Sequence, residues 1–123
     1  MKLAHYNTFC KSLPHTHHVV QWGGAHVWKV GGLKDGKVFA IGWFDGSVDG
    51  GITFKCSPMS FELLKEQEGC RPAPYLASRG MKWIQRTNDT FLGDKDLKAY
   101  LAASHKLAAA SLTKKRQREL GFI

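Results

Sequence analysis

Residues 19–56 read VVQWGGAHVWKVGGLKDGKVFAIGWFDGSVDGGITFKC, and this stretch decides the fold. It contains four short apolar segments, at 19–22, 25–30, 38–44 and 52–56, separated by glycine-rich turns. The pair Gly23-Gly24 is typical of a two-residue hairpin turn, because both glycines accept a positive φ. The segment 38–44 is apolar on both faces, which is expected of a central strand. Four successive strands with short connections predict an antiparallel sheet.

Helical spacing of apolar residues is found on either side of this stretch. The predicted helices cover 3–13, 58–68 and the residues after Asp94, with 114–118 continuing the last one. Pro14 ends the first helix, Ser57 is a suitable N-cap before Pro58, and Asp94 is the expected N-cap of the third. Residues 81–86 are predicted to form the last strand, after a loop at 71–80.

These elements predict an α+β two-layer sandwich, in which an antiparallel sheet is covered on one face by helices. The length of 123 residues fits a single domain, residues 1–123. The core is expected to contain most of the large aromatic and aliphatic side chains of these elements. The predicted core residues are Trp22, Trp28, Phe39, Phe54, Phe61, Trp83, Tyr100 and Leu101.

The composition indicates a folded cytoplasmic protein. Hydrophobic residues make up 43% of the chain, which is enough for a packed core. No apolar run approaches the roughly 20 residues that a membrane helix needs, and polar residues interrupt the N-terminus too early for a signal peptide. Three widely spaced cysteines, Cys10, Cys56 and Cys70, form neither a disulfide framework nor a metal-binding pair. We therefore expect them to be reduced and to pack as small apolar side chains.

The chain carries a formal net charge of +8, and its distribution points to an anionic partner. Residues 71–87 contain four basic side chains and no acidic one, and a second basic run follows at 114–118. A basic surface attracts polyanions such as nucleic acid. The alternative is that these charges only keep the protein soluble.

No arrangement of residues predicts catalysis, a metal or another cofactor. His15, His17 and His18 lie in a predicted connector without a cysteine or carboxylate at ligand spacing, so a histidine-rich loop is the favoured interpretation. The glycines match neither nucleotide-binding motif, and no paired carboxylates stand out. A Cys–His nucleophile has no local signature. We predict a protein that is not an enzyme and has no cofactor.

The stretch 71–86 combines basic and aromatic residues, and it is the best candidate for contact with nucleic acid. Basic side chains neutralise phosphates, and an aromatic ring can stack on an unpaired base. For Trp83 we favour a place in the core of the last strand over base stacking. The candidate phosphate contacts are Lys55, Arg71, Arg79, Lys82 and Arg86, with Lys114, Lys115 and Arg116 from the basic run near the C-terminus.

The chain resembles the MmcQ/YjbR family over nearly its whole length. The resemblance rests on an ordered set of short motifs: Ser12-Leu13-Pro14, Trp22-Gly23, Phe39-Ala40, Lys55-Cys56-Ser57-Pro58, Pro74-Tyr75, Lys82-Trp83, Ser104-His105-Lys106-Leu107 and Leu112-Thr113-Lys114-Lys115. It implies a fold similar to the frataxin-like and secretion-chaperone-like sheets, a "double-wing" DNA-binding role, and no enzyme activity or cofactor. The family's lysine before a small residue and proline corresponds to Lys55, its basic residues to Arg79 and Lys82, and its tryptophan to Trp83. Lys82 stands where the family often has histidine, and His105 where an aromatic residue often follows the closing serine.

Two functions remain open from the sequence. The leading hypothesis is a DNA-binding protein of low sequence specificity, and the alternative is a protein- or small-ligand-binding module that uses the open face of the sheet. If Arg79, Lys82 and the 114–118 run lie on one positive face, DNA binding is favoured. If they lie apart, a protein partner is favoured. The sequence does not indicate the oligomeric state or a preferred DNA sequence.

Overall fold

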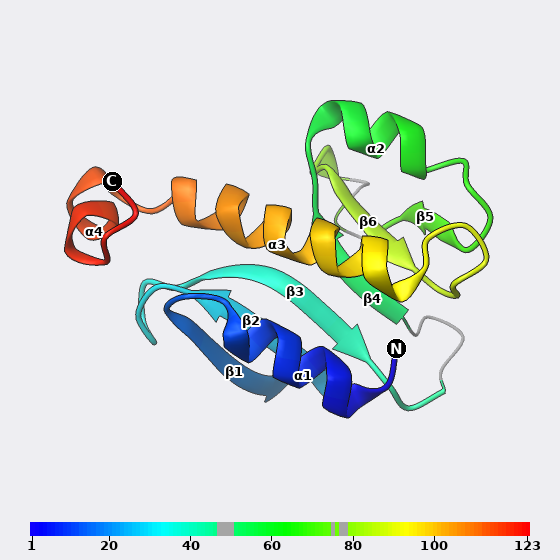
Figure 1. The fold of residues 1–123 in the computed structure, drawn as a ribbon, viewed down its shortest axis with the longest axis horizontal. Helices are drawn as coiled ribbons and strands as arrows, with labels where there is room; N and C mark the ends of the chain where they lie inside the picture. The colour runs from blue at the N-terminus through cyan, green and yellow to red at the C-terminus, as the bar shows by residue number, and fades with distance from the viewer. Residues whose placement is uncertain (47–50, 75, 77–78) are drawn as a thin grey trace.

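The structure, a computed structural model, describes residues 1–46, 51–74, 76 and 79–123 (Figure 1). Its described elements, in chain order, are α1 (Leu3–Ser12), β1 (Thr16–Gln21), β2 (Ala25–Val30), β3 (Lys37–Trp43), β4 (Gly51–Lys55), α2 (Pro58–Leu64), β5 (Cys70–Pro72), β6 (Trp83–Arg86), α3 (Asp94–Ala110) and α4 (Lys114–Glu119). The strands form an antiparallel sheet in the order β1-β2-β3-β4-β6-β5. The predicted α+β class and antiparallel sheet are therefore confirmed.

Several predicted boundaries were wrong. β1 begins at Thr16, so His17 and His18 belong to a strand and not to a connector. The first hairpin loop has three residues, because Gln21 pairs with Ala25, and Trp22 itself takes a φ of 53°. Gly93, not Asp94, is the N-cap of α3. The predicted turn between Asp45 and Gly51 includes residues 47–50, which lie outside the described residues.

Two further elements differ from the prediction. The predicted 71–80 loop begins inside a short edge strand, β5, which pairs with β6. Residues 114–119 form a separate helix and do not continue α3. The side chain of Thr113 caps this helix by accepting a hydrogen bond from the Arg116 backbone N–H at 3.2 Å. Ser57 caps α2 in the same way, as predicted, through the Ser60 N–H.

The helices pack on one face of the sheet, where the main core lies. α1 and α3 lie across this face, with α2 at its β5–β6 end (Figure 1). Aligned residues of successive strands, such as Ala40, Phe54 and Ile84, point into this core. Ser104 of α3 is fully buried and connects the two layers: its hydroxyl donates to the Phe39 carbonyl at 2.6 Å and accepts from the Lys55 N–H at 2.8 Å.

The other face of the sheet is covered at its centre. Val27, Ile41, Thr53 and Gln85 form one aligned row on β2, β3, β4 and β6, and all four are buried. Leu76, from the connection between β5 and β6, packs against the β2–β3 part of this row. The surface that we expected to be open is therefore exposed mainly towards the β1 edge.

Six of the eight predicted core residues belong to the main core, whereas Trp83 is buried outside that cluster of residues. Seven of the eight side chains are buried or partly buried in the structure. Trp22 is the exception, because it lies at the tip of the first hairpin and is 57% exposed. Trp83 is only 5% exposed, which confirms its place in the folded interior and leaves its ring unavailable to a nucleic-acid base.

His105 on α3 predicts a pH dependence of stability. Its ring is buried, hydrogen-bonded to the Pro14 carbonyl at 2.7 Å and in edge contact with Phe39. Burial lowers the pKa of His105 below its ordinary value, despite the opposing effect of the Pro14 hydrogen bond. The unfolded chain therefore binds this proton more readily than the folded protein does.

Stability from His105 should consequently be present above the pKa of about 6.5 of an unfolded histidine, and be lost as the pH falls below it. Urea unfolding between pH 8 and pH 5 measures this loss. His105→Gln should reduce the slope, whereas His5→Gln, at an exposed position of α1, should leave it unchanged. An equal slope in wild type and His105→Gln would contradict the assignment.

Candidate nucleic-acid interface

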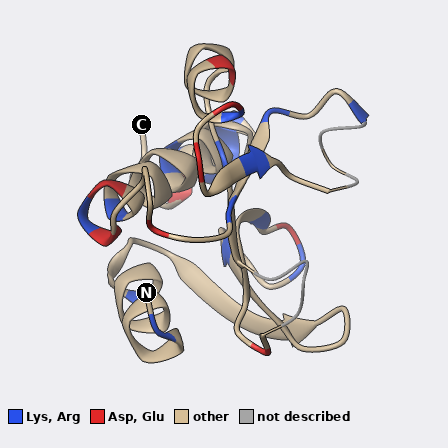
Figure 2. Ribbon diagram, turned by 90° about the vertical axis from the view of Figure 1, so that its right-hand side faces the viewer, with Lys and Arg blue, Asp and Glu red and all other residues tan. Residues whose placement is uncertain are grey.

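The predicted phosphate contacts do not form one surface. Lys55, Arg71, Arg79 and Lys82 belong to the β4–β6–β5 end of the molecule, whereas Lys114, Lys115 and Arg116 belong to α4 at the opposite end (Figure 1). Figure 2 looks at the first of these ends and shows basic residues on its strands and on the β5–β6 connection, with acidic residues on the nearby α2.

At the β4–β6–β5 end, two of the four candidate basic side chains are already engaged. The Nε of Arg71 donates to Gln85 Oε1 at 2.7 Å. The Nζ of Lys82 lies 4.9 Å from the centre of the Phe61 ring, and its charge helps to lower the pKa of Glu62, after the larger effect of the Lys65 hydrogen bond. Lys55 is half-buried and Arg79 is exposed. This end thus combines basic and acidic groups.

Arg86 has a structural place and is not available to phosphate. It is 5% exposed, and its Nη1 donates to the Leu92 carbonyl at 2.9 Å and to Asp94 Oδ1 at 3.0 Å. The hydrogen bond from Arg86 is the main reason that the pKa of Asp94 is lowered. We therefore remove Arg86 from the set of candidate contacts.

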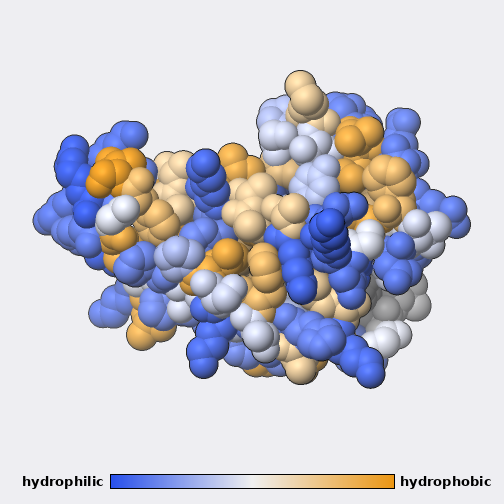
Figure 3. Space-filling model, in the orientation of Figure 1, coloured by the Kyte–Doolittle hydropathy of each residue, from blue (hydrophilic) through white to orange (hydrophobic). Residues whose placement is uncertain are grey.

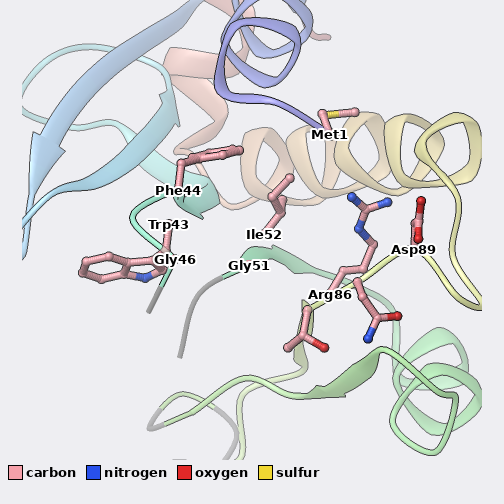
Figure 4. Close-up of a pocket in the computed structure, with 10 residues that line it drawn as sticks. Met1, Trp43, Phe44, Gly46, Gly51, Ile52, Arg86 and Asp89 are labelled. Carbon is pink, nitrogen blue, oxygen red and sulfur yellow. The ribbon is translucent and has the colours of Figure 1, made fainter. Parts of the chain in front are cut away.

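A pocket of about 410 Å³ lies beside Arg86 (Figure 4). Phe44 and Ile52 supply apolar lining, and Arg86 and Asp89 supply charged groups. The charges of the region balance, because Arg86 and the N-terminal amine both pair with Asp94 and Asp89 adds a second carboxylate. This pocket therefore has no pronounced preference for an anion.

The α4 end is built by packing of the C-terminal segment against the β2–β3 turn. Gln117 is buried and its Nε2 donates to the carbonyls of Ala110 and Leu112, at 3.2 and 2.7 Å. Arg116 reaches the turn directly, since its Nε donates to Asp35 Oδ2 at 2.6 Å. α4 is therefore held in place by hydrogen bonds to the end of α3 and to the β2–β3 turn.

This packing brings basic residues of the turn next to those of α4. The group, which we call the α4 basic end, contains Lys34, Lys37, Lys114, Lys115, Arg116 and Arg118, with Asp35 and Glu119 as its two acidic residues. Six positive and two negative side chains give it a net charge of +4. Both carboxylates bind the guanidinium of Arg116. The other five basic side chains are exposed and form no ion pair with any residue that the structure describes.

Sequence reasoning missed Lys34 and Lys37 as members of this group. Asp35 and Arg116 are 81 positions apart, and no pattern in the sequence indicates that they touch. Lys34 is next to Asp35, and Lys37 begins β3, so the contact is what places both of them near α4.

Comparison with known proteins identifies the family. A family model described as YjbR matches residues 11–107. The chain belongs to the YjbR family. The YjbR fold of this chain is similar to the crystal structure of the Deinococcus radiodurans protein DR2400, described with the domain DUF419: the TM-score is 0.81 at 24% identity, over 98% of this chain and 88% of that one. No curated protein matches the chain.

Two other features of the described residues bear on possible partners. None of their helices is both long enough and apolar enough to cross a membrane. They also contain no group of three or more histidine, cysteine, aspartate or glutamate side chains arranged to hold a metal ion. Cys10, Cys56 and Cys70 are free and buried, and burial raises the pKa of all three thiols.

Proposed function

We propose that this YjbR-family protein is a non-enzymatic DNA-binding protein of low sequence specificity, and that the α4 basic end makes its main phosphate contacts. The observation that carries the proposal is the group of five exposed basic side chains, on two packed elements, that have no carboxylate partner among the described residues. Cations of this kind displace counterions from DNA, and this displacement supplies most of the free energy of non-specific binding.

The location differs from that expected from the sequence. Arg79 and Lys82 were expected to make main phosphate contacts. However, α2 and the residues after it contribute Glu62, Glu66 and Glu68 to the same end of the molecule, and Lys82 lies over the Phe61 ring. The α4 basic end has the larger excess of positive charge. Phosphate contacts position a protein on DNA without reading the sequence, so low specificity is expected.

The basic segments lie apart, which was expected to favour a protein partner; we rank that partner second because the α4 basic end has an excess of positive charge by itself. The specific observation that favours a protein partner is Trp22, a large aromatic side chain exposed at a hairpin tip with a positive φ. Exposed aromatic residues are common at protein interfaces. On the face drawn in Figure 3, however, apolar residues form separate groups with hydrophilic residues between them, so this face offers no broad apolar surface.

The test of DNA binding compares two variants that remove the same charge from opposite ends. Lys114→Ala/Lys115→Ala should weaken binding to random-sequence duplex DNA and make the slope of log K against log salt shallower by about two units, at roughly 0.9 per phosphate. Arg79→Ala/Lys82→Ala should change the slope by much less. Fluorescence anisotropy at several salt concentrations measures both.

The outcomes separate the alternatives. Equal effects of both double variants would show that only the total charge matters, and a larger effect of Arg79→Ala/Lys82→Ala would place the interface at the β5–β6 end. No saturable binding below about 100 μM at low salt would be weaker than ordinary non-specific binding. The DNA-binding proposal would then be abandoned in favour of a protein partner.

A further inference from the structure

We propose that the groove between α1 and β1 is a binding site for a phosphate group or a similar oxyanion. This site is separate from the α4 basic end and does not depend on DNA binding. α1 crosses the β1–β2 hairpin on the helical face of the sheet (Figure 1), and the groove between them has a volume of about 450 Å³.

The residues that line this groove are suited to an anion. Asn7, Thr8 and Lys11 come from α1, Thr16, His17 and His18 from β1, and Trp28 from β2. The lining includes one permanently charged cation, Lys11, and no carboxylate. An anion entering the groove would therefore meet a positive side chain and several polar groups without repulsion from an acidic residue.

The orientation of the Asn7 amide follows from its neighbour. The Nε1 of Trp28, which can only donate, lies 3.0 Å from Asn7 Oδ1. The oxygen of the amide is therefore directed at Trp28, and its NH₂ group, with two donors, points away from the ring. Among the described residues this NH₂ group has no hydrogen-bond partner. It remains available to a ligand oxygen.

His18 is held in place on the other wall. Its ring lies 4.9 Å from that of Trp28 at an interplanar angle of 15°, and its Nε2 shares a hydrogen bond of 3.0 Å with Nδ1 of His26. Nδ1 of His18 is the ring nitrogen left for another partner. Burial and the nearby His26 lower the pKa of His18, so a bound anion would favour proton uptake by this ring.

The groove thus offers donors in a fixed arrangement, which reduces the entropy lost on binding. The Lys11 ammonium, the Asn7 NH₂ group, the Thr8 hydroxyl and protonated His18 can all donate to one tetrahedral oxyanion. Thr16 contributes less, since its hydroxyl already donates to the Leu13 carbonyl at 3.1 Å. Several donors around one anion match the chemistry of phosphate and sulfate.

Titration with inorganic phosphate and with sulfate, followed by NMR, tests the site. Saturable shifts are expected for the Asn7 side-chain amide and the His18 ring. Lys11→Ala should weaken binding about tenfold, as expected for the loss of one charge-assisted hydrogen bond. Lys2→Ala, which removes the same charge at the other end of α1, should leave the affinity within about twofold.

The pH profile gives an independent readout. Sulfate keeps its charge between pH 5 and pH 8, so tighter sulfate binding at lower pH would report protonation of the protein. The titratable groups near His18 are Lys11 on α1, His17 on β1 and His26 on β2. The profile should flatten in His18→Gln and persist in His5→Gln, because His5 is an exposed residue of α1 that does not line the groove.

Short oligonucleotides distinguish the two sources of the phosphate. If the site takes a nucleic-acid end, a 5′-phosphorylated strand should compete with sulfate better than the same strand with a 5′-hydroxyl, whereas failure of both strands to compete would indicate a small phosphorylated molecule. Shifts that remain linear with anion concentration, or equal losses in Lys11→Ala and Lys2→Ala, would overturn the proposal.

Discussion

Replacing Trp83 by alanine is expected to lower the free energy of unfolding by about 3–5 kcal/mol. The ring is 5% exposed on β6, where Trp83 pairs with Lys55 of β4. Truncation removes a large apolar contact area and leaves a cavity that surrounding side chains fill only in part. Urea denaturation followed by circular dichroism measures the change.

Trp22→Ala is the matched control, because it truncates the same side chain at an exposed site. Its effect should stay within about 0.5 kcal/mol, as for most surface substitutions. Trp83→Phe should cost less than Trp83→Ala, since it keeps a ring and removes an indole N–H that is buried without a partner among the described residues. If Trp83→Ala kept full stability and lost DNA binding, the ring would have to be assigned to base stacking.

Patterns of two kinds predicted most of the fold. Alternation of apolar residues between glycine-rich turns located β2, β3 and β4, and local cap chemistry located the start of α2 at Ser57. Both are properties of neighbouring residues in the chain. These local patterns were less reliable predictors where tertiary contacts decide the conformation. β5 has only three residues and exists because β6 pairs with it, so no periodicity could indicate it.

The candidate sites show the same limitation more strongly. The sequence identified basic residues but gave no distance between them, and the structure places β6, which follows Lys82, and α4, which begins at Lys114, in separate parts of the molecule (Figure 1). The histidines near residue 17 were considered together, yet the contact that matters joins His18 to His26 across the hairpin. This pairing depends on the three-residue loop at Trp22, which sets the register of β1 against β2.

The second variant with a large expected loss of stability is Ser104→Ala, which removes a contact between α3 and the sheet. The Ser104 hydroxyl satisfies the Phe39 carbonyl and the Lys55 N–H, which belong to adjacent strands, from within a helix. Ser104→Ala should lower the free energy of unfolding by about 1–3 kcal/mol, because buried polar groups lose their partner. Because Ser104 is fully buried, a water molecule has no space to replace its hydroxyl.

Ser111→Ala tests whether the stability loss expected in Ser104→Ala comes from burial of the hydrogen-bonded groups or from loss of a serine hydroxyl alone. Ser111 follows α3, and its hydroxyl donates to the Ala108 carbonyl at 2.6 Å, the same distance as in the Ser104–Phe39 hydrogen bond. Because the Ala108 carbonyl also accepts from the Ser111 backbone N–H at 3.0 Å, it keeps a partner, and the variant should lose less than about 0.5 kcal/mol. Equal losses in the two variants would mean that Ser104 does not hold α3 to the sheet. A larger loss at Ser104 alone would show that this hydroxyl, and not helix propensity, fixes α3 across β3 and β4.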